Sequence, residues 1–524
     1  MKYFLSGNEA VAMAAHDCGV DLGCGYPGTP SSEILDELSK LGSRAEWAPN
    51  EKCALEVAIG VAYANGKALA TMKHVGLNVA ADPFFTIAYS GTPGQLVVIT
   101  ADDPGMASSQ NEQDNRRYAV AAGVPMFEPA DSQECYDFMC AAFELAGKFR
   151  SPVLFRLTTR VCHSKCVVIR RKSTPDVKNV PGFVKDPASN VMVPAFARKA
   201  HRRLRADLAK MAELNEESCC NLLRTGSAEL GIITSGIAYQ HVLDAAPEAS
   251  VLKLGMTYPL PIEKIRRFAA GVKRCLVIDE GDNFLFEQIM SAGIPVEAKL
   301  EDFRFGELNV QRVRKLIARD TTPEAPGAPG KPPQLCPGCP HRKTFEVLRD
   351  MNCIVSGDIG CYTLGVMPPF NAIDTCVCMG ASVTVGLGMR HTLPEADARR
   401  VVSVIGDSTF LHTGINGIVE MVYNRPATGH VVIILDNSIT AMTGCQENPA
   451  TGYKLDESPA FAVSFENIVR GIGVDNVDTI DTTAEPERFA ELLKTRLASN
   501  DCSVIIAKRP CILGIAKRKK MENR

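Results

Sequence analysis

Two polar residues in the last third of the chain have the types and spacing of a cation and phosphate site. Asp407 follows Val401–Ile405, an apolar run that predicts a buried strand. Asn437 follows the next such run, Val431–Asp436, and 28 residues separate it from Ser408. Ligands bind beyond the carboxyl ends of parallel strands, and carboxylate and amide oxygens suit a small octahedral cation that also binds phosphate.

The residues beside Asp407 favour the same interpretation. Gly406 would let the backbone approach a diphosphate, and the helix expected after Ser408 would present its N-terminal amides to the anion. The alternative is an ordinary turn at the end of a strand, capped by Asp407.

A pair of cysteines, Cys336-x-x-Cys339, forms a two-ligand clip. It would fit zinc, an iron–sulfur cluster or a redox dithiol, but no nearby CxxC or HxxxH completes a zinc site. The chain has 19 cysteines, which are too dispersed for a small disulfide framework and indicate a reducing cytoplasm. Most of them should be small buried hydrophobes.

Charge and hydropathy exclude several classes of protein. The net charge is -3 and the basic residues are scattered, which argues against a nucleic-acid partner. No run approaches the roughly 20 apolar residues that span a membrane, and the N-terminus does not resemble a signal peptide.

Alternating strand and helix patterns must position these residues. Runs such as Leu96–Thr100 and Leu230–Thr234, separated by helical stretches, predict an α/β fold of three doubly wound domains with mostly parallel sheets. The expected divisions are a first domain over residues 1–171, a connector with a basic helix (Phe196–Leu214) over 172–224, a second domain over 225–318, a Pro/Gly linker over 319–332 and a third domain over 333–524.

The Gly-Asp-Ser motif followed by Asn437 resembles the signature of thiamine-diphosphate enzymes. The resemblance implies that Asp407, Asn437 and the main-chain carbonyl of Ile439 hold Mg²⁺, and that Gly380 also belongs to the cofactor-binding residues. The first domain would bind the pyrimidine ring and the third the diphosphate, within one chain or across chains.

Thiamine enzymes also need a glutamate that exchanges a proton with the aminopyrimidine ring, and a buried carboxyl suits that role. Glu51 matches the pattern, because it opens an Ala/Gly-rich helix with Gly60 nine residues later. Glu56 is the rival candidate, in a poorer register. The alternative for Glu51 is a first-turn residue that favours the helix dipole.

Five further blocks resemble the large subunit of indolepyruvate:ferredoxin oxidoreductase over essentially the whole chain. They are Gly25–Ser32, Thr71–Asn78, Ser108–Asp114, Leu335–Arg342 and Gly357–Thr363. In the wider 2-oxo acid:ferredoxin oxidoreductase family the threonine of the first block lies near the substrate carboxylate, which here implies Thr29. Lys73 and His74 could stabilise that carboxylate or a developing negative charge, although a structural histidine is an equal alternative. Relatives carry histidine where this chain has Ala107.

The same family binds a [4Fe-4S] cluster through a Cys-Pro-x-Cys pair, a Gly-Cys and a distant Pro-Cys. The matching thiols here are Cys336, Cys339, Cys361 and Cys511, with Cys376, Cys378 and Cys445 as spare candidates. Large subunits of this family usually end in a ferredoxin-like module with two cysteine-rich runs, and the sequence contains no such run.

The resemblance as a whole implies oxidative decarboxylation of an aryl 2-oxo acid to an acyl-coenzyme A and CO2. A small second subunit would be the partner, and ferredoxin or a separate ferredoxin-like subunit would take the electrons. A non-oxidative thiamine-diphosphate decarboxylase is the alternative.

Overall fold

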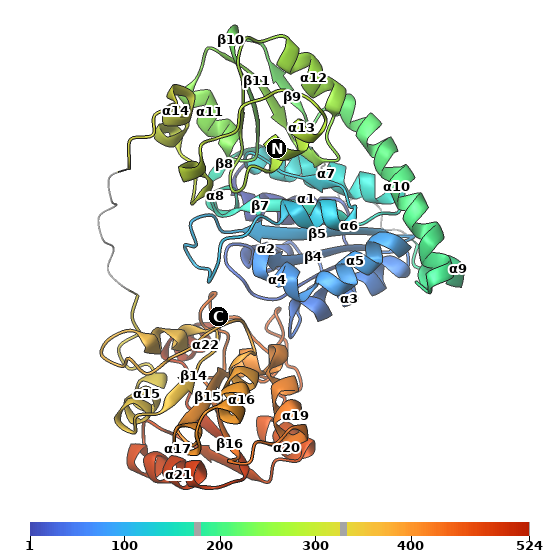
Figure 1. The fold of residues 1–524 in the computed structure, drawn as a ribbon. Helices are drawn as coiled ribbons and strands as arrows, with labels where there is room; N and C mark the ends of the chain where they lie inside the picture. The colour runs from blue at the N-terminus through green and yellow to red at the C-terminus, as the bar shows by residue number, and fades with distance from the viewer. Residues whose placement is uncertain (172–179, 325–332, 523–524) are drawn as a thin grey trace. The chain divides into compact units, whose positions relative to one another are not determined.

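The computed structural model describes residues 1–171, 180–324 and 333–522 in two compact units, Met1–Ala325 and Pro326–Arg524 (Figure 1). The α/β fold with mostly parallel sheets, predicted from the sequence, is confirmed. The units divide within the predicted linker of 319–332, and unit 1 contains both the first and the second predicted domains. Residues 172–179 of the connector and 325–332 of the linker lie outside the described residues.

The main sheet of unit 1 has seven strands in the order β12-β6-β7-β5-β4-β2-β3, parallel except for β12. The strands are β2 (Leu22–Gly25), β3 (Ala45–Trp47), β4 (Lys67–Lys73), β5 (Gln95–Asp102), β6 (Met126–Phe127), β7 (Val153–Thr158) and β12 (Met256–Tyr258). β4, β5 and β7 are almost wholly buried, as expected of central parallel strands covered on both faces.

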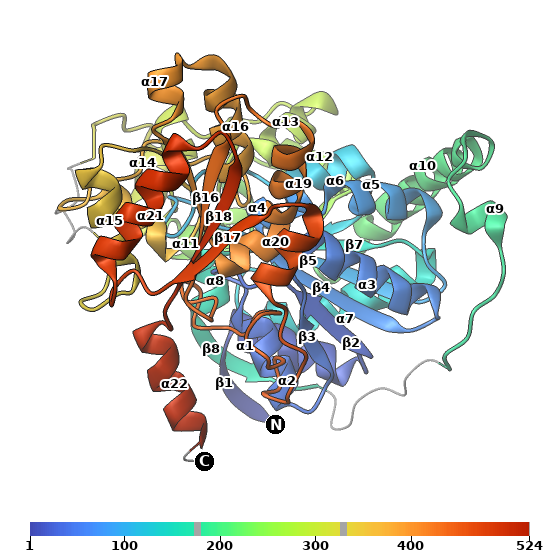
Figure 2. The ribbon, with the colours of Figure 1, turned by 90° about the horizontal axis from the view of Figure 1, so that it is seen from below.

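Helices cover both faces of this sheet, with α7 on one face and α3 and α5 on the other (Figure 1). They are α1 (Gly7–Asp17), α2 (Glu33–Lys40), α3 (Glu51–Tyr63), α4 (His74–Val79), α5 (Ala81–Ser90), α6 (Arg116–Ala122), α7 (Ser132–Phe149) and α8 (Thr159–His163). A small antiparallel pair, β1 (Lys2–Ser6) and β8 (Lys165–Ile169), lies near the N-terminus (Figure 2).

A second sheet completes unit 1, with the order β13-β10-β11-β9. Its strands are β9 (Leu222–Arg224), β10 (Ser227–Ser235), β11 (Ala249–Leu254) and β13 (Cys275–Ile278). Its helices are α11 (Ala238–Ala245), α12 (Ile262–Ala270), α13 (Phe284–Ser291), η1 (Glu301–Arg304) and α14 (Val310–Ala318). β12 comes from this part of the chain but pairs with β6 of the main sheet, so one chain segment contributes strands to both sheets.

The connector contains α9 (Pro187–Asn190) and the long helix α10 (Pro194–Glu216). The basic helix predicted over Phe196–Leu214 is therefore present and slightly longer. Its buried side chains recur along one face, at Ala200, Leu204, Leu208 and Met211, which is the spacing of a helix that packs on one side only.

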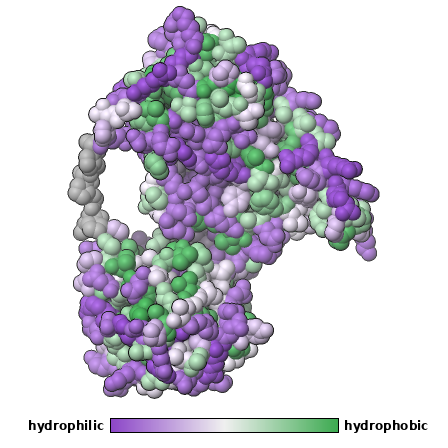
Figure 3. All heavy atoms as spheres, in the orientation of Figure 1, coloured by the Kyte–Doolittle hydropathy of each residue, from purple (hydrophilic) through white to green (hydrophobic). Residues whose placement is uncertain are grey.

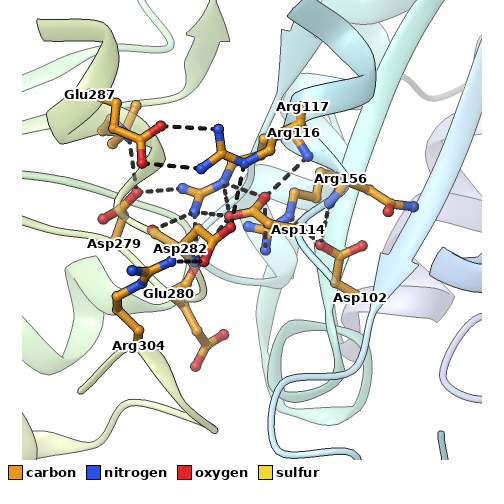
Figure 4. Close-up of polar contacts among 12 residues, drawn as sticks. Asp102, Asp114, Arg116, Arg117, Arg156, Asp279, Glu280, Asp282, Glu287 and Arg304 are labelled. Carbon is orange, nitrogen blue, oxygen red and sulfur yellow. Dashed lines mark hydrogen bonds and ion pairs between the residues drawn. The ribbon is translucent and has the colours of Figure 1, made fainter. Parts of the chain in front are cut away.

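A buried network of charged side chains joins the two sheets of unit 1 (Figure 4). Arg116 at the start of α6 is fully buried and donates to Asp114 (2.8 Å from Nε) and to Asp279 beyond β13 (2.6 Å). Arg156 of β7 donates to Asp102 (2.7 Å) and Glu128 (2.9 Å). Buried charges persist only when they are paired, so these ion pairs hold the two sheets together.

The network contains more carboxyl groups than cations. Its buried acidic side chains are Asp102, Asp114, Glu128, Asp279 and Glu280, and its buried cations are Arg116, Arg156 and Lys299. Burial raises the pKa of Glu280 to about 7 and also raises the pKa of Asp102. The folded state therefore holds protons that the unfolded chain would release.

This excess makes the stability of unit 1 depend on pH. The pKa of Glu280 in the folded protein lies above its ordinary value of 4.5, so its protonated state favours folding at low pH and that contribution disappears as pH rises toward 7. Glu280→Gln should therefore raise the free energy of unfolding more at pH 8 than at pH 5, by a difference of up to about 3 kcal/mol, and the thermal midpoint should rise more at pH 8 accordingly. Differential scanning calorimetry at the two pH values would measure this difference. Glu287→Gln is the control: Glu287 forms a half-exposed ion pair with Arg117, and its substitution should change stability equally at both pH values. An equal gain at both pH values would contradict the prediction.

Unit 2 is a five-stranded parallel sheet in the order β14-β15-β16-β18-β17. The strands are β14 (Ile354–Ser356), β15 (Val401–Gly406), β16 (His430–Asp436), β17 (Asn476–Ile480) and β18 (Cys502–Lys508). The helices are α15 (His341–Asp350), η2 (Cys361–Val366), α16 (Ser382–Thr392), α17 (Glu395–Ala398), α18 (Asp407–Thr409), η3 (Phe410–Gly414), α19 (Ile415–Tyr423), α20 (Phe465–Ile472), α21 (Pro486–Ala498) and α22 (Ile512–Glu522).

Alternating residues of β16 serve two separate cores. Val431, Ile433 and Leu435 pack with α15 and α21 on one face, whereas Val432 and Ile434 pack with α16, α19 and α20 on the other. This period of two fixes the register of the strand and so the position of Asp436 and Asn437 at its end.

The surfaces of the two units differ. Polar residues cover much of the visible face of unit 1, whereas apolar residues gather on the visible face of unit 2 (Figure 3). Among the described residues, no helix combines the length and hydropathy needed to cross a membrane.

Candidate functional site

Asp407 and Asn437 lie together at the carboxyl edge of the unit 2 sheet. β15 ends at Gly406 and its parallel neighbour β16 ends at Asp436. The backbone N–H of Ile439 donates to both side chains, to Oδ2 of Asp407 (3.2 Å) and to Oδ1 of Asn437 (3.1 Å). A single donor shared by the two oxygens shows that they converge on one point, as the spacing in the sequence predicts.

The Asp407 carboxyl is buried, with only 3% of its surface exposed. Burial, together with the nearby charge of Asp436, raises the pKa of Asp407 to about 7, against the hydrogen bonds from the N–H groups of Ser408 and Ile439. A divalent cation bound at this point would lower the pKa of Asp407 and keep its carboxylate ionised. One carboxylate, one amide oxygen and the nearby carbonyl of Ile439 are hard oxygen donors that fit Mg²⁺.

The chain after Asp407 is helical without interruption through α18, η3 and α19. Its middle turn, Phe410–Gly414, is a π-helix, a rare form that is frequent at functional sites. The Ser408 hydroxyl accepts a hydrogen bond from Thr440 (2.9 Å). The predicted helix at the candidate diphosphate position is therefore present.

Two of the predicted glycines are required by close packing. A side-chain carbon at Gly406 would lie 2.6 Å from the Tyr362 ring. Gly380 has φ +84°, and a side chain there would collide with the Thr413 hydroxyl. The N–H of Gly380 donates to Asp358 (2.8 Å), so the structure gives this glycine a role in holding a loop.

Asp358 is a residue of this edge to which the sequence analysis assigned no role. It is fully buried and accepts from the N–H groups of Ile359 (2.8 Å), Gly380 (2.8 Å) and Ser382 (2.9 Å). Burial nevertheless raises its pKa to about 6. Asp358 lies within the Gly357–Thr363 block, and this was the signal in the sequence that could have identified it as a site residue. The carboxyl ties together two loops that flank Asp407.

Glu51 occupies the first position of α3 in unit 1, as predicted. It is 5% exposed, after the N-cap residue Asn50, whose side chain accepts from the N–H of Cys53 (2.8 Å). A side-chain carbon at Gly76 would lie 2.6 Å from Oε1 of Glu51, so the carboxyl packs directly on α4. The rival Glu56 is exposed and paired with Lys52, which removes it from any enclosed site.

Lys73 is the last residue of β4 and His74 is the first residue of α4, and both side chains contact the loop of residues 103–115. Nζ of Lys73 donates to the carbonyl of Ser108 (2.6 Å), and burial lowers the pKa of Lys73. His74 is fully buried, and its Nε2 lies 3.2 Å from the carbonyl of Asn111. This placement favours a role for His74 in positioning the loop, which also carries the exposed Ala107.

Thr29 lies on the loop that follows β2 and is partly exposed. A side-chain carbon at the adjacent Gly28 would lie 3.0 Å from Cβ of Lys73. The structure therefore brings Thr29, Lys73, His74 and Glu51 to neighbouring elements of one sheet edge.

The four predicted cluster cysteines share one neighbourhood in unit 2. Burial raises the pKa of Cys361 to about 12, and negative charge on Cys339, Cys511, Cys336 and Cys445 adds to the effect. Cys445 therefore belongs to this group, whereas the exposed Cys376 and Cys378 influence each other.

The spacing of these thiols bears on the kind of metal they could hold. No group of three His, Cys, Asp or Glu side chains in the described part of the chain is arranged to hold one metal ion. In a [4Fe-4S] cluster each of the four thiolates would bind a different iron.

A buried histidine lies between the cysteines and Asn437. His341 opens α15, two residues after Cys339, and its Nε2 lies 3.2 Å from Nδ2 of Asn437. Burial lowers the pKa of His341 to about 4, so the ring is neutral at pH 7. Sequence reasoning assigned it no role, although it stands in the Leu335–Arg342 block.

Comparison with known proteins identifies both halves of the chain. Residues 358–507 match the family model described as "Thiamine pyrophosphate enzyme, C-terminal TPP binding domain". Residues 13–190 match "Pyruvate flavodoxin/ferredoxin oxidoreductase, thiamine diP-bdg".

Similar proteins cover nearly the whole chain. The indolepyruvate oxidoreductase subunit IorA of Archaeoglobus fulgidus is 38% identical over 100% of this chain and 88% of its own length. That of Methanothermobacter thermautotrophicus is 41% identical over 98% and 87%. The fold is shared with a solved 2-oxoglutarate:ferredoxin oxidoreductase from Magnetococcus marinus, at a TM-score of 0.51 and 17% identity over 61% of this chain and 65% of that one. The chain therefore belongs to the IorA family, within the thiamine-diphosphate-dependent 2-oxo acid oxidoreductases.

Proposed function

We propose that this protein oxidatively decarboxylates aryl 2-oxo acids, such as indolepyruvate, to the acyl-coenzyme A and CO2, and passes the electrons to ferredoxin. The observation that carries the proposal is the convergence of Asp407 and Asn437 on the N–H of Ile439, in a chain whose relatives are named indolepyruvate oxidoreductase. Bound thiamine diphosphate would supply the carbanion chemistry that releases CO2 from a 2-oxo acid.

Each unit would contribute its own residues. In unit 2, Asp407, Asn437 and the Ile439 carbonyl would hold Mg²⁺, with Gly406 and Ser408 beside the diphosphate. In unit 1, Glu51 would exchange a proton with the aminopyrimidine ring, and its burial at a helix start suits that task. Thr29 and Lys73 would orient the substrate carboxylate, with His74 holding the adjacent loop.

Cys336, Cys339, Cys361 and Cys511 would bind a [4Fe-4S] cluster that accepts the electrons one at a time. Their mutual proximity supports this assignment. A small second subunit would complete the enzyme in the cytoplasm, with ferredoxin or a separate ferredoxin-like subunit as the acceptor.

Anaerobic purification with the small subunit tests the proposal. We expect about four irons per chain and an absorption band that bleaches on addition of an aryl pyruvate with coenzyme A. Cys361→Ser should lose most of the iron. Cys353→Ser is the matched control in the same unit, since its thiol is similarly buried with a pKa of about 11, and it should keep the iron. A colourless protein that releases aldehyde without coenzyme A would instead identify a non-oxidative decarboxylase.

A further inference from the structure

The orientation of the Asn437 amide follows from its neighbours. The N–H of Ile439 donates to Oδ1 of Asn437 at 3.1 Å, and the reversed amide would place an NH2 group against that N–H. Nδ2 therefore faces His341, and Nε2 of His341 must accept its hydrogen bond. The ring thus holds the amide so that its oxygen stays on the side of Asp407.

The segment that carries His341 is itself tied to the cysteine group. The backbone N–H of His341 donates to the sulfur of Cys339, which lowers the pKa of that thiol against the larger effect of burial. From the other side, the N–H of Cys511 donates to the main-chain carbonyl of Asn437 (2.9 Å). Asn437 is therefore held by one residue from each of the two cysteine segments.

We propose that His341 is a positioning residue for the cation site, which acts by fixing the Asn437 amide with its oxygen toward Asp407. The inference rests on the proposed role of Asp407 and Asn437 as cation ligands. Residues that hydrogen-bond to a metal ligand commonly change the metal affinity by 10–100-fold when they are mutated. The Asn437 amide is buried, so without His341 its NH2 group would have to move to reach another acceptor. His341 also makes the geometry of the cation site depend on the Cys336–Cys339 turn.

Binding of Mn²⁺ in the presence of thiamine diphosphate, followed by electron paramagnetic resonance on the full chain with its small subunit, tests this role. His341→Phe keeps the edge contact with Tyr362, whose ring lies 6.0 Å away, but removes the acceptor. We expect it to weaken Mn²⁺ binding by about 10–100-fold. His341→Gln can supply an acceptor oxygen and should stay within about threefold of the wild type, since hydrogen bonding is retained.

His430→Phe is the matched control. His430 begins β16, at the end of the strand opposite to Asn437. It is also buried, and its Nε2 lies 2.8 Å from the hydroxyl oxygen of Ser403. The substitution should lower the thermal midpoint and leave Mn²⁺ affinity unchanged. Wild-type affinity in His341→Phe, or an equal loss in His430→Phe, would overturn the inference. If the wild type itself does not bind Mn²⁺ with thiamine diphosphate, the proposed cofactor site fails instead.

Discussion

Glu51→Gln should lower the rate of 2-oxo acid oxidation by about 10²–10⁴-fold, because a positioned proton-transfer group contributes that much. The glutamine keeps the shape of a side chain that is 5% exposed and packed against Gly76, but it cannot exchange a proton. Cofactor binding should therefore change little. Viologen reduction by an aryl pyruvate with coenzyme A measures the rate, and calorimetric titration measures thiamine diphosphate affinity.

Glu56→Gln is the matched control on the same helix. Glu56 is exposed and paired with Lys52 across one turn, so its loss should leave the rate at the wild-type level. Should Glu51→Gln keep more than a tenth of the wild-type rate, the assignment of Glu51 would be wrong.

Arg116→Met should destabilise unit 1 by about 3–5 kcal/mol, the usual effect of removing one partner of a buried ion pair. The guanidinium is fully buried and bonded to Asp114 and Asp279, so both carboxylates would be left without it. Because the network already holds more buried acids than buried cations, little other charge within it compensates for the loss. The thermal midpoint of unit 1 should fall by roughly 10 °C.

The neighbouring residue provides the control. Arg117 is half-exposed and its partners Glu287 and Asp282 are also partly exposed, so Arg117→Met should cost less than about 1 kcal/mol. Arg116→Lys keeps the charge but not the planar fork, and an intermediate midpoint is expected. Equal midpoints for Arg116→Met and Arg117→Met would show that the network does not hold the sheets together.

The sequence was most informative where a residue's neighbours along the chain determine its place. Asp407 and Asn437 follow apolar strands, and adjacent parallel strands bring their ends together. Glu51 was recognisable because it begins a helix in a better register than Glu56, and its burial, against the exposure of Glu56, agrees with that choice.

Long-range contacts could not be predicted in the same way. The bond between His341 and Asn437 joins residues 96 positions apart, and no pattern within α15 or β16 encodes it. The pairing of Arg116 with Asp279 spans 163 positions. In both cases the packing of whole helices and strands determines which residues pair, and the local periodicity of the sequence carries no information about that packing.

The pairing of β12 with β6 has a consequence for how this chain can be divided. β12 lies at the edge of the main sheet and satisfies backbone groups of β6, while the N–H of Glu128 donates to the carbonyl of Gly255 (2.8 Å). A fragment that ended at residue 171 would expose β6 as an open edge, a surface prone to aggregation. A strand of the second αβ segment, β12, thus covers the edge of the main sheet of the first segment. Truncated or recombined chains should therefore keep β12 together with the main sheet if they are to stay soluble.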